Sequence, residues 1–195
     1  MARLGNTLGT ASNHYNSVAF NLFYRHGIHA TGINTILSES GVAKKTLYNH
    51  FESKNALILA TLELRDQHFY HWLSNRLANV TAGKDALYEL FFALDDWFNQ
   101  KVTELSPFCG CYFINTAAEF KTPDDPIHQL CAQHKEKIQQ LITKHIELIT
   151  DDKPQRAFLI TAIMTLKEGA IVQAHVLNDA QSAIKAKAIL HRLLA

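Results

Sequence analysis

Several features are missing from this chain of 195 residues, and each absence argues against a class of protein. Only three cysteines occur, an odd number, and no basic and apolar leader is recognisable, which argues against a secreted, disulfide-held protein. No uninterrupted run of about 18 apolar residues is present, so we predict no membrane contact. No phosphate loop or dinucleotide motif occurs, and no cofactor is predicted. We expect a cytoplasmic protein.

Glycine and proline are also scarce, with eight and four residues, and they separate apolar segments of helical period. No convincing alternating strand is present. The sequence therefore predicts an all-α protein of about nine helices. The predicted helices span residues 12–26, 33–40, 44–51, 54–77, 84–102, 108–120, 126–149, 154–178 and 181–194.

The formal net charge is only +1, which does not point to a polyanionic partner for the molecule as a whole. The charge is unevenly distributed, however. Residues 1–60 hold five Lys and Arg against two acidic residues, whereas residues 61–195 hold 14 against 16. The positive excess therefore lies in the N-terminal third.

Residues 31–51, TGINTILSESGVAKKTLYNHF, have the pattern of a helix-turn-helix. Gly41 lies between two short amphipathic segments and is free to adopt a positive φ. Val42, Leu47 and Phe51 are predicted to pack the second short helix onto the first. The helix over residues 12–26, which ends at Gly27, completes a three-helix core.

Polar side chains are left on the outer face of the second short helix. Their amines, hydroxyls, amide and imidazole suit phosphate oxygens and base edges in a DNA major groove. A solvated helix face in another kind of bundle is the alternative. The side chains are Lys44, Lys45, Thr46, Tyr48, Asn49 and His50.

Residues 21–57 resemble the DNA-binding domain of the TetR family of bacterial transcriptional regulators. The family pattern is an apolar helix ending in Leu-Phe and then Gly, followed by Thr, an Ile-bearing helix, Gly-Val and Thr-Leu-Tyr-x-His-Phe-x-Ser-Lys. The residues that match it are Leu22, Phe23, Gly27, Thr31, Ile36, Gly41, Val42, Thr46, Leu47, Tyr48, His50, Phe51, Ser53 and Lys54.

The resemblance implies roles for individual residues. Lys44, Lys45 and Asn49 are expected to lie at or near base edges. The expected phosphate anchors are Thr31, Thr46, Tyr48, His50 and Lys54, with packing on the first helix as the alternative for Tyr48 and a plain surface role for His50. Two positions depart from the family: Ala43 stands where a Ser or Thr cap is common, and the N-terminal arm has only Arg3 as a basic residue.

The resemblance also implies how the molecule is organised. We expect a helix-turn-helix DNA-binding domain over residues 1–52 and a larger helical domain over residues 53–195 for ligand binding and dimerisation. The expected function is that of a homodimeric repressor, released from a palindromic double-stranded DNA operator by an unknown small-molecule effector. Dimerisation is expected through the last two helices, on apolar faces formed by Phe158, Ile160, Ile163, Leu166, Ala170, Ile171 and Ala174, and by Ile184, Ala188, Ile189 and Leu193. Packing within one chain is the alternative for these faces.

The helix predicted over residues 108–120 is the main candidate for a ligand pocket. It is apolar nearly all round, yet Cys111, Asn115 and Glu119 recur at intervals of four residues and so share one stripe. Polar groups on a buried helix line a cavity or satisfy a neighbour, and helix packing is the alternative for Cys111. The predicted pocket residues are Trp72, Trp97, Cys111, Tyr112, Asn115 and Glu119.

Other chemistries remain open at this stage. His128, Cys131 and His134 recur every three residues and are weak candidates for zinc or copper ligands. Cys109, Cys111 and Cys131 are candidates for redox or electrophile sensing if a nearby cation activates them. We predict no enzyme and no catalytic residue, because Cys131 and His134 on a regular helix have neither a third orienting residue nor oxyanion donors.

Overall fold

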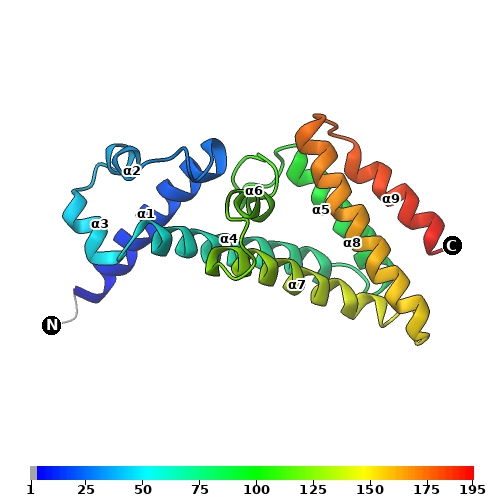
Figure 1. The fold of residues 1–195 in the computed structure, drawn as a ribbon. Coiled ribbons are helices and arrows are strands. Elements are labelled where there is room, and N and C mark those ends of the chain that lie inside the picture. Colours follow the sequence, from blue (N-terminus) through cyan, green and yellow to red (C-terminus); the bar gives the residue numbers. More distant parts are fainter. Residues whose placement is uncertain (1–3) are drawn as a thin grey trace. The chain divides into compact units, whose positions relative to one another are not determined.

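A computed structural model describes the backbone of residues 4–195 and the side chains of residues 14–195 (Figure 1). These residues form nine α-helices and no strand, as the glycine and proline spacing predicts. The helices are α1 (Leu4–His26), α2 (Ile33–Ser40), α3 (Lys44–His50), α4 (Lys54–Ala78), α5 (Lys84–Phe98), α6 (Tyr112–Glu119), α7 (Pro126–Ile146), α8 (Lys153–Val176) and α9 (Ser182–Leu193).

The chain divides into two compact units. The first unit runs up to Asp66 and also includes Tyr112–Ala132, and the second unit comprises Gln67–Cys111 and Gln133–Ala195. Helix α4 therefore contributes to the first unit up to Asp66 and to the second from Gln67. The unit that contains the helix-turn-helix thus also includes α6, which the predicted boundary after residue 52 assigns to the C-terminal domain. As the place where the DNA-binding function ends, that boundary stays a prediction.

The first unit contains the predicted helix-turn-helix. Its core includes one residue from each of the first three helices, Ala19, Ile36 and Leu47, and each of them is buried to 1% exposure or less. Phe51, which ends α3, is also buried. Gly27 and Gly41 have φ of 88° and 68°, in the left-handed region where a side chain is strained, so both end their helices as predicted.

Helices α5, α8 and α9 lie side by side in the second unit (Figure 1). Their interface is built from fully buried apolar side chains, among them Leu90 on α5, Ile163 on α8 and Leu190 on α9. An aromatic cluster packs beside it: the Phe69 and Trp97 ring centroids are 5.2 Å apart, and those of Trp97 and Phe108 are 4.8 Å apart. Burial of these apolar side chains and rings stabilises this unit.

Two predicted helix boundaries on either side of the loop between α5 and α6 are wrong. Helix α5 ends at Phe98, where residue 102 was predicted, because Gln100 has a positive φ of 61°. Helix α6 begins at Tyr112, where residue 108 was predicted, because Gly110 has a φ of 83°. Cys111 therefore precedes α6, and the four-residue interval cannot place it on a stripe with Asn115 and Glu119.

The N-terminal arm is only partly described. Helix α1 begins at Leu4, before the predicted start at residue 12. Arg3, the one basic residue noted in the arm, lies outside the described residues.

Helix α8 is long and apolar enough, by length and composition alone, to cross a membrane, and it is the one such helix in the described part of the chain. Helix α8 does not meet the criterion of an uninterrupted run of about 18 apolar residues, because Lys167 and Glu168 interrupt its apolar residues. The core helix of a soluble protein passes the same test. Helix α8 packs against α5 and α9, and 33% of its apolar window is buried inside the protein.

Candidate nucleic-acid interface and ligand cavity

The short helix α3 presents a polar face to solvent. Leu47 is 1% exposed and docks the helix on its neighbours, whereas Lys44, Lys45 and Asn49 are exposed. The three side chains expected at base edges are therefore available to a ligand. Their role in reading bases stays a prediction.

Tyr48 and Thr46 are also placed to reach a partner. Tyr48 is 43% exposed, which favours the phosphate-anchor role over packing on the first helix. Thr46 is half-buried. Helix α3 lacks a side-chain cap, since Ala43 takes the N-cap position in an extended conformation with no side-chain hydrogen bond.

Three of the expected phosphate anchors are engaged inside the protein. Thr31 is buried, and its Oγ1 donates to the Gly27 carbonyl at 2.7 Å. The Lys54 Nζ donates to the Ile28 carbonyl at 2.6 Å, and burial lowers the pKa of this lysine while the charge of Glu119 partly opposes that effect. The His50 ring centroid lies 5.5 Å from that of Tyr15 on α1. The structure thus gives each of these side chains an internal contact that the family pattern does not reveal.

Glu119, expected in the ligand pocket, instead contacts the loop between α1 and α2. Its carboxylate accepts hydrogen bonds from the backbone N–H of Ile28 at 2.8 Å and of His29 at 2.6 Å. The His29 Nδ1 lies 2.9 Å from the same carboxylate. Sequence analysis could not find this contact, because 90 residues separate the partners and no local pattern pairs them.

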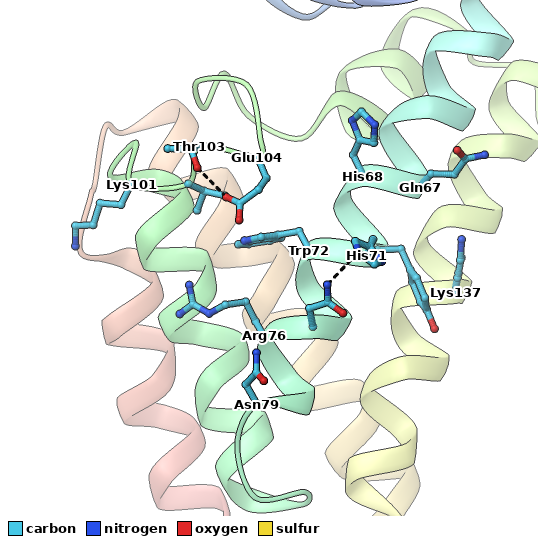
Figure 2. Close-up of a pocket in the computed structure, with 13 residues that line it drawn as sticks. Gln67, His68, His71, Trp72, Arg76, Asn79, Lys101, Thr103, Glu104 and Lys137 are labelled. Atoms are coloured by element: carbon cyan, nitrogen blue, oxygen red, sulfur yellow. Dashed lines mark hydrogen bonds between the residues drawn. The ribbon is translucent and has the colours of Figure 1, made fainter. Parts of the chain in front are cut away.

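A cavity of about 1070 Å³ lies in the second unit (Figure 2). Helix α4 contributes His68, His71 and Trp72 to its lining, the loop after α5 contributes Lys101–Glu104, and α7 contributes Lys137. The remaining lining residues are Gln67, Tyr70, Asn75, Arg76 and Asn79.

Only Trp72 of the six predicted pocket residues lines this cavity. Trp97 is 2% exposed and packs in the aromatic core, and Tyr112 is 1% exposed in the first unit. The Tyr112 hydroxyl lies 2.8 Å from the Thr61 Oγ1, and burial raises the pKa of this tyrosine. Asn115, like Glu119, belongs to the first unit and is half-buried there. A pocket role for the α6 residues stays a prediction, and Glu119 follows the alternative, in which a polar side chain satisfies its neighbours.

Two carboxylates hold the Arg76 side chain in the cavity lining. Its Nε donates to the Glu89 carboxylate at 2.6 Å and its Nη1 to the Asp96 carboxylate at 2.9 Å. Burial alone lowers the pKa of Arg76, but these two carboxylates outweigh burial and raise it. Asp96 also lies 3.5 Å from the Lys101 Nζ. The lining is therefore rich in hydrogen-bonding groups, and two carboxylates compensate the positive charge of the Arg76 guanidinium.

Cys111 lies beside a group of three charges, of which Lys167 is buried and Lys135 and Glu168 are half-buried. The Lys135 Nζ is 3.5 Å from the Cys111 Sγ and 2.8 Å from the Glu168 carboxylate, which also pairs with the fully buried Lys167. Burial alone raises the pKa of Glu168, but Lys167 and Lys135 outweigh it and lower the value to about 2. Two ammonium groups thus share one carboxylate next to a thiol.

The candidate metal ligands do not form a cluster. In the described residues no group of three or more His, Cys, Asp and Glu side chains is arranged to hold a metal ion. The His128 Nδ1 lies 2.7 Å from the Phe120 carbonyl, a backbone contact. None of the three cysteines forms a disulfide.

A helix-turn-helix that has a buried apolar core and an exposed, polar second helix is typical of DNA-binding regulators. Comparison with known proteins agrees with this class. Residues 17–61 match the model described as bacterial regulatory proteins, tetR family. This region of the chain is therefore similar to the DNA-binding region of TetR-family transcriptional regulators.

The similarity extends beyond the DNA-binding region. An uncharacterized HTH-type transcriptional regulator in the lacX 3' region of Lactococcus lactis subsp. lactis is 24% identical over 162 residues, which cover 81% of this chain and 80% of that one. This relative is described as a regulator, not as an enzyme.

Solved structures show the same fold. A TetR-family regulator from Streptomyces coelicolor superposes with a TM-score of 0.84 at 23% identity, covering 100% of this chain and 95% of that chain. The reduced form of NemR from E. coli gives a TM-score of 0.78 at 18% identity, covering 95% and 98%. At these identities the likeness concerns the fold alone.

Proposed function

We propose that the protein is a cytoplasmic, homodimeric repressor that binds a palindromic operator and is released by a small-molecule effector. The observation that carries this proposal is the exposed set Lys44, Lys45, Tyr48 and Asn49 on α3, a helix docked by Leu47. In a dimer the two α3 helices must lie about 34 Å apart to enter successive major grooves. A small change in dimer geometry is then sufficient to release DNA.

The proposed dimer uses α8 and α9, which carry large apolar side chains exposed to solvent. Phe158, Val172 and Val176 on α8 and Ile189 on α9 are each at least 46% exposed. A shallow groove of about 570 Å³ on α8 includes Gly169 and Val172, a shape that suits a helix of a second copy. Of the residues predicted for this face, four instead pack inside the protomer: Ile163, Ala170, Ile171 and Ala174.

The proposed effector site is the cavity beside α4. Its imidazoles, amides and hydroxyls, together with the rings of Tyr70 and Trp72, suit a ligand with an aromatic or apolar body and several hydrogen-bonding groups. Replacing His68 and His71 with Ala is expected to weaken effector-driven release of DNA. His191→Ala, which removes an exposed imidazole outside the cavity lining, is the control.

Operator binding is tested with the DNA upstream of the protein's own gene. We expect a tight, sequence-specific gel shift whose affinity falls steeply with salt, because each neutralised phosphate releases a counterion. Lys44→Ala combined with Tyr48→Phe should weaken the shift and leave the oligomeric state unchanged. Lys144→Ala, an exposed lysine on α7, should have little effect. Equal binding to random DNA would contradict the proposal.

A second candidate function is thiol-based sensing by the same fold, favoured by the 3.5 Å contact between Lys135 and Cys111. Cysteines that react with electrophiles often lie against a cationic group, as Cys111 does here. Under this alternative, a thiol-reactive quinone releases DNA from the wild type and not from Cys111→Ser. Cys109→Ser and Cys131→Ser are matched controls, and retained release in the triple serine variant would contradict it.

A further inference from the structure

The loop between α1 and α2 holds two backbone N–H groups that point at one carboxylate. Helix α1 ends at His26, and Gly27 follows with a φ of 88°. The next two N–H groups, of Ile28 and His29, both donate to Glu119. Successive N–H groups after a left-handed residue form a concave anion site, and here the anion is a side chain of the same protein.

A lysine holds the other side of the same loop. The Lys54 Nζ at the start of α4 donates to the Ile28 carbonyl at 2.6 Å, while Glu119 accepts from the Ile28 N–H at 2.8 Å. Ile28 itself is 1% exposed. Opposite charges from α4 and from the end of α6 therefore fix one buried residue through both of its backbone polar groups.

Further contacts restrict the position of Glu119. The ring of the next residue, Phe120, stacks on His29 at a centroid distance of 5.0 Å, and the His29 Nδ1 lies 2.9 Å from the Glu119 carboxylate. A Cβ on Gly27 would lie 3.3 Å from the Glu119 Oε1, so the carboxylate packs directly on the backbone. The Glu119 carboxylate and the two N–H groups that donate to it are thus both held in position for these hydrogen bonds.

The loop between α1 and α2 determines where α2 lies relative to the end of α1. Helix α2 begins at Ile33, and the Thr31 Oγ1 closes the loop by donating to the Gly27 carbonyl. Beyond α2, only residues 41–43 separate it from α3, so a displaced loop displaces α3 as well.

We propose that Glu119 is a positioning residue for operator binding, which acts through the N–H groups of Ile28 and His29. The proposal rests on the DNA-binding function above. It makes residues 112–132 part of the DNA-binding unit, although they lie far from it in sequence.

The test compares Glu119→Gln and Glu119→Ala with Glu63→Gln, which removes an exposed carboxylate from α4 in the same unit. The first readout is amide hydrogen exchange in the full-length protein without DNA. Glu119→Ala should speed exchange at Ile28 and His29 about tenfold or more, because it removes hydrogen bonds to a charged acceptor. The Gly27 N–H, which donates to the Phe23 carbonyl, should be unaffected.

The second readout is the operator Kd, measured by fluorescence anisotropy at temperatures where all variants are folded by circular dichroism. Operator binding should weaken about tenfold in Glu119→Ala, less in Glu119→Gln, which keeps one acceptor oxygen, and not in Glu63→Gln. Faster exchange with an unchanged Kd would show a contact without a positioning role and would overturn the proposal. Unchanged exchange would overturn the contact itself, whereas a wild type without operator binding would contradict the proposed function instead.

Discussion

At the scale of single residues, the pair of lysines around Glu168 is the most consequential charge arrangement in the second unit. Lys167 is 1% exposed, and burial lowers the pKa of its amine. A buried ammonium group is tolerated only when a carboxylate compensates it, and breaking such a pair costs about 3–5 kcal/mol. Glu168 serves both Lys167 and Lys135, so its removal leaves two cations uncompensated.

Glu168→Gln should lower the free energy of unfolding by about 3 kcal/mol at pH 7. The folded pKa of Glu168 is depressed to about 2, below its usual value of 4.5. The stabilisation is therefore complete above about pH 4.5 and is lost as the pH falls towards 2. Urea unfolding of wild type and variant should show a difference that shrinks across this range. A difference independent of pH would contradict the assignment.

At the scale of elements, helix ends decide where the functional side chains lie. Helix α3 has only seven residues and no side-chain cap, because Ala43 occupies the N-cap position. Helix α6 starts four residues later than its apolar pattern predicts, because Gly110 adopts a φ of 83°. The first feature weakens the proposed recognition helix, and the second places Cys111 beside Lys135 instead of on α6.

Ala43→Ser should stabilise α3, because a serine at this extended N-cap position can accept a hydrogen bond from the N–H of the first turn. We expect the free energy of unfolding to rise by about 1 kcal/mol. Hydrogen exchange of the α3 backbone amides should slow by the factor that corresponds to this free energy. Ala43→Val, which fits the extended backbone but adds no acceptor side chain, is the control; equal stabilisation by both would contradict the capping explanation.

Gly110→Ala should destabilise the protein for two reasons. Its φ lies in the left-handed region, and a Cβ there would meet the His175 ring at 2.9 Å. Gly41→Ala is a matched control, since Gly41 has a φ of 68° but nothing within 4 Å of a Cβ. The control should lose about 1 kcal/mol from backbone strain alone, and Gly110→Ala should lose more. Equal losses in urea unfolding would mean that the close approach to His175 is unimportant.

At the scale of the whole molecule, the exposed apolar residues of α8 and α9 call for a covering partner. Large apolar side chains on one face of a soluble protein mark an interaction surface. The same apolarity makes α8 meet the length and composition criterion for a membrane span. In the proposed dimer a second copy of the chain covers this face and supplies the paired α3 helices that a palindromic operator would require.

Val176→Glu should convert the proposed dimer to monomer, because it places a charge in an apolar interface. Val176 is 66% exposed in the protomer, so the folded monomer should tolerate the change. Leu148→Glu is the control, since Leu148 is 67% exposed but lies after α7, outside α8 and α9. Sedimentation velocity should show monomer only for Val176→Glu, with operator binding lost in parallel; an unchanged dimer would place the interface elsewhere.

Much of the fold follows from local sequence. The periodic apolar residues specify the helices, and Gly27 and Gly41 end two of them, because such signals act within a few residues. The family motif likewise identifies the exposed side chains of α3. The roles of Thr31, Lys54 and Glu119 were not predictable in this way, because each donates to, or accepts from, a backbone group of the α1–α2 loop.

The sequence by itself therefore determined the all-helical class, the helix-turn-helix and the resemblance of the DNA-binding region to TetR-family regulators. Only the tertiary structure decided that Glu119 belongs to the DNA-binding unit and that the cavity uses Trp72 without Trp97. The physical reason is the range of the interactions. Helix formation and turns depend on neighbours in sequence, whereas a buried carboxylate finds its donors wherever folding places unpaired N–H groups.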